Sequence, residues 1–235
     1  MDFGQGIDGR PRLPKNRLLV ALAIICTVMP LAAIGQTPNA PKSQSQSVPQ
    51  EYRLATGFYK QQRWDLAADA FRDFLKKYPN HERVPYARLY LGLTLVNADQ
   101  LSDARKVLRD YVRDYPKSKS LPDVLYRVGE CSYLLDDLKS ADTEFQQFLK
   151  QYPQHDLVEW ALPYFADTKL RLKEPEAARD LFKKSLAQYP RGRLTEDSKF
   201  GLARADEELK DFDAAAALYS ELAENKATGR GPPNH

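Results

Sequence analysis

The sequence predicts an all-α fold, an α-solenoid of about five helical hairpins that repeat every 37 residues. Three observations predict it: a Tyr-Pro dipeptide recurs at this spacing, small and bulky residues align at the same spacing, and apolar residues within each period recur every three or four positions. The last pattern is typical of helices that bury one stripe. A single hairpin cannot cover its own apolar face, so neighbouring hairpins are expected to stack.

The Tyr-Pro dipeptides mark where the second helix of each hairpin is expected to end. The residue before a proline is disfavoured in the α conformation, and proline itself donates no backbone hydrogen bond. The four dipeptides contain Pro79, Pro116, Pro153 and Pro190. Their three identical intervals of 37 residues predict one hairpin per interval.

Residues 37 positions apart form columns of similar size. One small column is Ala55, Gly92, Gly129, Ala166 and Ala203. A second is Ala67, Ala104, Ala141, Ala178 and Ala215. A bulky column contains Phe71, Leu108, Phe145, Phe182 and Tyr219, and another runs Trp64, Leu101, Leu138, Pro175 and Phe212, with Pro175 as its one break. Small residues let two helix backbones approach, so these columns predict the points where the helices of a hairpin cross.

The N-terminus has the order of a secretory signal. Four basic residues between positions 10 and 17 precede an apolar run, residues 18–34, and Gly35 follows. Residues 1–35 are therefore predicted to be a cleaved signal peptide, and the chain to be exported to the periplasm or cell envelope. The alternative is an inner-membrane anchor formed by residues 18–34, because this run approaches the minimum length for crossing a bilayer.

The remaining chain divides into three parts by composition. Residues 36–50 are polar and lack an apolar period, which predicts a disordered linker. Residues 51–225 hold the five repeats, with approximate boundaries 51–84, 85–121, 122–158, 159–195 and 196–225. Residues 226–235 are predicted to be a flexible tail. No polar capping helix follows the fifth unit, so we expect further repeats or self-association at this end.

Composition and motifs argue against several function classes. The formal net charge of the chain is only +3, which gives no sign of a nucleic-acid partner. No phosphate-binding loop, serine elbow or zinc motif occurs, so no catalytic, cofactor or metal residue is predicted, and the chain is expected not to be an enzyme. His81 and His155 are expected in turns of separate units, and Cys131 shares a column of small residues and is expected to pack.

The small, small, bulky and proline positions resemble the tetratricopeptide repeat, whose motif matches Ala55, Ala67, Phe71 and Pro79 in the first unit. The resemblance covers about residues 48 to 225 and implies a right-handed α-solenoid, although the period of 37 residues exceeds the usual length of about 34. Residues 71–79, Phe-Arg-Asp-Phe-Leu-Lys-Lys-Tyr-Pro, are similar to a bacterial envelope subgroup. That subgroup includes outer-membrane assembly factors of the BamD type and the periplasmic coordinator of the Tol-Pal division machinery.

In this family the inner helices line a concave groove that holds a partner peptide or helix. The family's groove positions fall here on Tyr52, Tyr59, Tyr86, Tyr90, Tyr126, Arg127, Tyr133, Trp160, Tyr164 and Arg171. Tyrosine gives contact area at small entropic cost, which favours binding, but aromatic stripes on helices also pack between repeats. Of the positions with which chaperone adaptors grip a C-terminal carboxylate, only Arg127 matches, so such a clamp is not expected.

The resemblance thus implies a non-enzymatic scaffold of the bacterial cell envelope that binds a protein or peptide. Outer-membrane assembly and envelope or division coordination are the roles it implies. The alternative is a regulatory or substrate-presenting module of a larger enzyme or secretion complex, with this chain a fragment of it. A membrane is expected as a partner only through an uncleaved N-terminus.

Overall fold

The computed structural model describes residues 48–227 of the 235-residue chain. The predicted signal peptide, nearly all of the predicted linker and most of the predicted tail lie outside these residues. The described part contains ten α-helices and no β-strand. The helices are α1 Gln50–Lys60, α2 Trp64–Lys77, α3 Val84–Asn97, α4 Leu101–Asp114, α5 Leu121–Leu134, α6 Leu138–Gln151, α7 Val158–Arg171, α8 Pro175–Gln188, α9 Thr195–Glu208 and α10 Phe212–Ala227.

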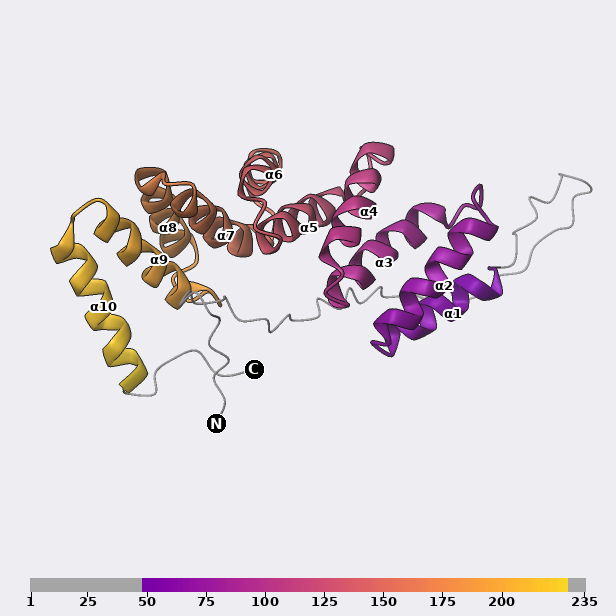
Figure 1. Cartoon of the computed structure of the whole chain (residues 1–235), viewed down its shortest axis with the longest axis horizontal. Coiled ribbons are helices and arrows are strands. Elements are labelled where there is room, and N and C mark those ends of the chain that lie inside the picture. Colours follow the sequence, from indigo (N-terminus) through magenta and orange to yellow (C-terminus); the bar gives the residue numbers. More distant parts are fainter. Residues whose placement is uncertain (1–47, 228–235) are drawn as a thin grey trace, which may run out of the picture. The chain divides into compact units, whose positions relative to one another are not determined.

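The helices form five hairpins, each made of an odd-numbered A helix and the even-numbered B helix that follows it. Every helix packs against the helices before and after it, as Figure 1 shows. Three pairs of successive A helices also touch each other: α1 with α3, α5 with α7, and α7 with α9. Successive B helices make no comparable contact in the described residues. The A helices therefore lie on the inner side of the stack. This architecture confirms the predicted all-α helical repeat fold.

Each A helix ends in the same left-handed turn. One residue per unit has a positive φ, with values from 59° to 66°, and these residues are Gln62, Asp99, Asp136, Lys173 and Lys210. In the first unit the amide of Gln62 donates to the carbonyl of Tyr59, and the amide of Arg63 donates to the carbonyl of Phe58. This pair of bonds is a Schellman motif, which satisfies carbonyls that a helix end leaves without partners.

The first four B helices end directly before the Tyr-Pro dipeptides. Tyr78, Tyr115, Tyr152 and Tyr189 are the C-terminal caps, with φ near −130°. An extended backbone is what the residue before proline favours. The helices also explain the proline that interrupts the bulky column: Pro175 is the first residue of α8, where proline needs no amide partner and its fixed φ suits the helix.

Three details of the hairpins refine the sequence interpretation. The helix α1 begins at Gln50, inside the range assigned to the linker, and α10 extends two residues beyond the range assigned to the last unit. Asp137, from the acidic pair between α5 and α6, caps α6 because its side chain accepts a hydrogen bond from the amide of Ser140 at 3.3 Å.

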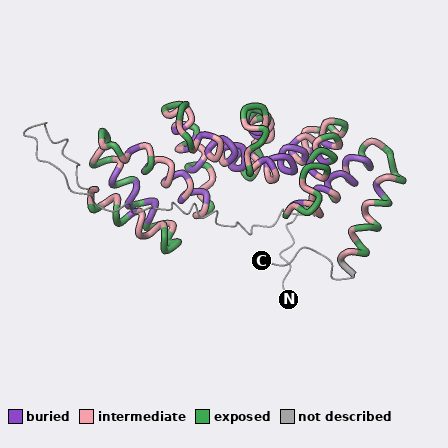
Figure 2. Tube along the Cα trace, turned by 180° about the vertical axis from the view of Figure 1, so that it is seen from behind, coloured by how far each residue is buried: buried purple, intermediate pink, exposed green. Residues whose placement is uncertain are grey.

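The core runs along the hairpin crossings. All members of the two small columns are buried. A Cβ added to Gly92 would lie 2.3 Å from Leu108, and one added to Gly129 would lie 2.9 Å from Phe145, so both glycines sit directly over the bulky column of their own hairpin. Figure 2 shows the buried residues running through the inner helices, with exposed residues on the outward sides. Within residues 48–227, no helix has the length and apolar character needed to cross a membrane.

Candidate protein-binding face

The candidate binding face is the inner side of the stack, which the A helices line. Every residue expected at a groove position lies on one of the first four A helices. Tyr52 and Tyr59 are on α1; Tyr86 and Tyr90 are on α3. The remaining six divide between two helices: Tyr126, Arg127 and Tyr133 on α5, and Trp160, Tyr164 and Arg171 on α7.

Much of this aromatic stripe holds the repeats together. Tyr90 stacks on Phe71 of the preceding hairpin with ring centroids 6.0 Å apart, and Tyr59 meets Tyr90 edge-on at 5.1 Å. The same arrangement recurs 74 residues later, where Tyr164 stacks on Phe145 at 6.3 Å and Tyr133 meets Tyr164 at 5.0 Å. Units one and two are thus matched by units three and four. Such aromatic pairs stabilise a packed interface by about 0.5 to 1.5 kcal/mol beyond area burial.

Units three and four satisfy two of their inner tyrosine hydroxyls internally. The hydroxyl of Tyr133 donates to Asp167 at 2.8 Å, and the hydroxyl of Tyr126 lies 3.4 Å from Glu130. Burial raises the pKa of Tyr133, and the neighbouring Asp167 carboxylate raises it further. Burial raises the pKa of Tyr126 in the same way, with Glu130 adding to the effect. Both hydroxyls therefore stay protonated and act as donors to carboxylates.

Arginines complete this polar row. Arg127 contacts Glu130 at 2.7 Å, and Arg204 on α9 contacts Asp167 at 3.3 Å. Burial on its own would lower the pKa of Arg127, but the Glu130 carboxylate together with Tyr126 and Cys131 outweighs it and holds the pKa above its usual value. Sequence reasoning missed Arg204. Its column, Thr56, Leu93, Glu130, Asp167 and Arg204, is polar and charged in the last three units, and this change along the column is the signal that could have found it.

Units one and two lack these acceptors. The residues that correspond to Glu130 and Asp167 are Thr56 and Leu93. Units one and two carry four tyrosines on their A helices, and none of their hydroxyls makes a hydrogen bond to another side chain of residues 48–227; these tyrosines are Tyr52, Tyr59, Tyr86 and Tyr90. We call these four residues the aromatic patch. On the inner face, Tyr52 and Tyr59 therefore keep hydroxyl donors that their matches, Tyr126 and Tyr133, use on Glu130 and Asp167.

The aromatic patch is accessible and lies beside a cation. Tyr86 is 53% exposed, and Tyr52, Tyr59 and Tyr90 are half-buried. The guanidinium of Arg83 lies 5.7 Å from the centre of the Tyr86 ring. In contrast, Tyr126 is 2% exposed and Tyr164 is 8% exposed, so both serve packing and offer almost no surface. Of the aromatic groove positions, only Tyr86 in unit two is exposed.

The two remaining groove positions are held by neighbours. Trp160 is half-buried, with the guanidinium of Arg193 at 6.0 Å from its ring centre. Arg171 lies over the ring of Tyr133 at 5.3 Å and forms an ion pair with Asp136 in the turn before α6. The charge of Arg171 is therefore already paired within the chain.

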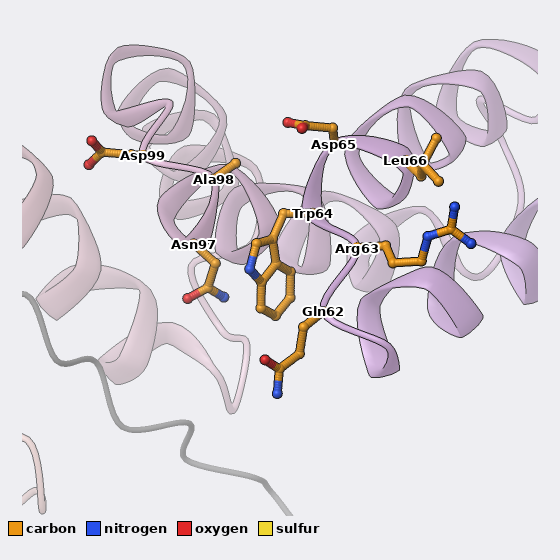
Figure 3. A pocket seen from close by; sticks show the side chains of 8 residues that line it. All are labelled: Gln62, Arg63, Trp64, Asp65, Leu66, Asn97, Ala98 and Asp99. Atoms are coloured by element: carbon orange, nitrogen blue, oxygen red, sulfur yellow. The ribbon is translucent and has the colours of Figure 1, made fainter. Parts of the chain in front are cut away.

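A separate shallow pocket lies at the turns of units one and two. It has a volume of about 540 Å³ and is lined by Gln62, Arg63, Trp64, Asp65, Leu66, Asn97, Ala98 and Asp99. Figure 3 shows the Trp64 indole between Gln62 and Asn97. The pocket brings together a helix start and the next turn, and its titratable lining residues are Arg63, Asp65 and Asp99.

His81, His155 and Cys131 have structural surroundings. The Nδ1 atom of His81 accepts the amide of Arg83 at 3.1 Å, and that of His155 accepts the amide of Leu157 at 3.3 Å. Cys131 is buried in α5. Among residues 48–227, no group of three or more His, Cys, Asp or Glu side chains is placed to hold a metal ion.

Comparison with family models decides the family. Two models described as tetratricopeptide repeat match the chain, one at residues 52–119 and 165–230 and the other at residues 123–155. The chain belongs to the tetratricopeptide repeat family. The matched ranges cover more than half of the 235 residues and include part of every hairpin.

Solved tetratricopeptide-repeat structures share the fold at low sequence identity. A MamA protein is 18% identical with a TM-score of 0.63, and the match covers 79% of this chain and 96% of that one. MamA from Desulfovibrio magneticus RS-1 is 13% identical with a TM-score of 0.64, covering 76% and 94%. A tetratricopeptide repeat protein from Parabacteroides merdae ATCC 43184 is 15% identical with a TM-score of 0.64, covering 76% and 66%. No curated protein matches in sequence.

Proposed function

We propose that this chain is a non-enzymatic protein-binding scaffold of the bacterial cell envelope and that the aromatic patch is its binding site. One observation carries the proposal: the hydroxyls of Tyr52 and Tyr59 lack the carboxylate acceptors that their matches have, Glu130 for Tyr126 and Asp167 for Tyr133. Family membership supports the class of function, because stacked repeats form extended binding surfaces.

The patch defines what a partner must bring. Its rings offer apolar area, and its hydroxyls need acceptors, so a fitting segment carries apolar side chains together with carboxylates or free main-chain carbonyls. An extended peptide or one face of a helix presents such groups at regular intervals.

Photocrosslinking in the source cell tests the binding site. A benzoylphenylalanine in place of Tyr86 should capture a protein partner, whereas the same residue in place of Lys76, which is exposed on α2, should not. The double variant Thr56→Glu, Leu93→Asp supplies the missing carboxylates internally and should abolish capture at position 86. Equal capture at positions 76 and 86, unaffected by the double variant, would reject the proposal.

The envelope location rests on the sequence of residues 1–35, which lie outside the described residues. Roles in outer-membrane assembly or in envelope and division coordination belong to the same proposal. Cell fractionation with mass measurement of the mature chain tests it. We expect a soluble periplasmic product that starts after Gly35. Retention of the full mass in the inner membrane would favour the anchor alternative, and a cytoplasmic product would contradict export.

A further inference from the structure

The first helix presents an open junction face. At the repeat position of Leu54, the later units carry Leu91, Val128, Phe165 and Leu202, which are between 3% and 7% exposed. Leu54 itself is 50% exposed. The difference arises because a preceding hairpin covers each later residue; the ring of Phe165, for example, lies 6.5 Å from that of Phe145. In the described residues no hairpin precedes α1, so the face that would receive one is uncovered.

The last helix presents the opposite open face. Phe212 is 62% exposed, whereas Trp64, Leu101, Leu138 and Pro175, its matches in the earlier units, are half-buried. Ala216 is exposed, whereas Ala68 in the same column is fully buried. Figure 2 shows the terminal helix coloured mainly as exposed or half-buried. Thus α10 displays the surface that every earlier B helix uses to bind the next hairpin.

At the junctions between hairpins, residues of two columns face each other. The column on the B helices is Ala68, Arg105, Asp142, Arg179 and Ala216, and the column on the A helices is Phe58, Leu95, Ser132, Lys169 and Asp206. Each residue of the first column faces the residue of the second column in the next unit. Arg105 meets Ser132 with Nη1 and Oγ 3.3 Å apart, and Asp142 meets Lys169 at 2.6 Å. At the fourth junction, Arg179 is close enough to Asp206 to affect its carboxyl group. Burial raises the pKa of Asp206, and the positive charge of Arg179 works in the opposite direction.

The two open faces complement each other under the same rules. Suppose that α1 of a second copy packs on α10 as the next A helix would. Ala216 of the first copy then faces Phe58 of the second copy, and this apolar pair buries no unpaired charge. Tyr219 then meets Leu54, as Phe145 meets Phe165 within the chain. Tyr219 also meets Arg53, in the place where Tyr164 stacks on Phe145. A guanidinium over a tyrosine ring is favourable, and Glu207, which accepts the Tyr219 hydroxyl at 3.2 Å, adds a nearby negative charge.

We propose that the chain associates with itself head to tail, with α1 of one copy docked on α10 of another copy. The association does not rest on ligand binding at the aromatic patch. Because the two faces differ, each complex keeps one free face of each kind, so copies add in a row rather than closing as a symmetric dimer.

One pair at the rim of this junction opposes association. Within the chain, the left-handed turn residue of one unit faces the last residue of the next A helix, as in the pairs Asp136 with Arg171 and Lys173 with Glu208. The same positions bring Lys210 of one copy opposite Lys60 of the next. The variant Lys60→Glu replaces this like-charge pair with the equivalent of Lys173 and Glu208. We expect it to associate at lower protein concentration than the unchanged chain.

Sedimentation and light scattering of the purified chain over a range of concentrations test the proposal. Leu54→Glu blocks one face and Ala216→Glu blocks the other, and both positions are exposed in the single chain, so folding should be unaffected. Each variant alone should remain a monomer. An equimolar mixture should form a dimer and nothing larger, because each variant keeps the face that the other lacks. The control Leu134→Glu, at an exposed apolar position away from both ends, should associate like the unchanged chain.

Three results would overturn the proposal. The unchanged chain could stay monomeric at all concentrations. Either face variant could associate normally when alone, which would indicate pairing of like ends or a different surface. The mixture of the two face variants could fail to form a dimer although the unchanged chain associates. Crosslinking at Tyr86 reports on the aromatic patch separately, so failure of one proposal is distinguishable from failure of the other.

Discussion

At the residue scale, the repeat depends on five residues held in a left-handed conformation without a glycine among them. A side chain in this conformation costs about 1 kcal/mol, because its Cβ approaches the following carbonyl oxygen. Each is held there by the Schellman bonds at the end of its A helix. The protein therefore carries the same small strain five times, once in each unit.

Gln62→Gly should relieve this strain. The φ of Gln62 is 59°, and this side chain makes no ion pair that the substitution would remove. Glycine has no Cβ penalty there but gains freedom in the unfolded chain, so we expect a net stabilisation of about 0.5 kcal/mol. Thermal denaturation measures it. Gln61→Gly, at φ −84°, is the matched control and should destabilise. Equal effects of the two variants would contradict this account of the turn.

Asp197 should make stability depend on pH. Burial raises the pKa of this carboxyl to about 6, and the neighbouring Glu196 contributes. Because the folded state binds the proton more tightly than the unfolded state, the favourable contribution is complete below pH 3.8 and is lost as the pH rises to about 6. Asp197→Asn should therefore stabilise the protein at pH 7 by about 1 to 2 kcal/mol, allowing for solvent screening, and have little effect at pH 4.

Thermal melts of both proteins at pH 4 and pH 7 check this expectation. The comparison of variant with unchanged chain at each pH removes the contribution of other carboxyl groups, such as Asp137, whose pKa the Ser140 amide and hydroxyl and Arg105 lower. A stabilisation of the same size at both pH values would show that the charge of Asp197 is not its cause.

At the element scale, the hairpins depend on small residues where two helices cross. Ala141 is fully buried in α6, and its column is alanine in all five units. Ala141→Leu should force neighbouring side chains apart and destabilise the protein by about 1 to 3 kcal/mol. Chemical denaturation measures the loss. Ala217→Leu, on the exposed side of α10, is the control and should be close to neutral. If Ala141→Leu were equally neutral, the crossing would lie elsewhere.

The ends of the elements differed in how far the sequence could predict them. The B helices end at Tyr-Pro, and a proline leaves a direct signal in the sequence. The left-handed turns that follow the A helices had no local signal, because none of their positive-φ residues is a glycine; these residues are Gln62, Asp99, Asp136, Lys173 and Lys210. Pro175 interrupted the column of bulky residues, yet the structure places it at a helix start, which a comparison of residue sizes does not detect.

The candidate site was less predictable than the fold for a physical reason. A stripe of tyrosines on one side of a helix is equally compatible with packing and with binding, and the sequence does not say which rings are covered. The structure separates them through neighbouring acceptors: Tyr133 has Asp167, whereas Tyr59, its match in unit one, faces the column position of Leu93. The 74-residue relation between the two clusters is visible in the sequence, but its consequence needs the hydrogen bonds.

At the scale of the whole molecule, the described residues form one row of hairpins in which each contacts mainly its neighbours. Such arrays divide their surface between an inner side, where A helices approach each other, and two ends with unmatched faces. The aromatic patch belongs to the inner side, and Leu54 and Phe212 belong to the ends. A partner and a second copy can therefore occupy different surfaces of the same chain.

Hydrogen exchange with and without the crosslinked partner tests the central claim, that the inner face of units one and two binds protein. Amide exchange reports local opening, which a bound partner suppresses. We expect added protection in α1 and α3, and a smaller change in the B helices α6 and α8. The Thr56→Glu, Leu93→Asp variant should lose that protection. Protection confined to the B helices, or the same in the variant, would contradict the claim.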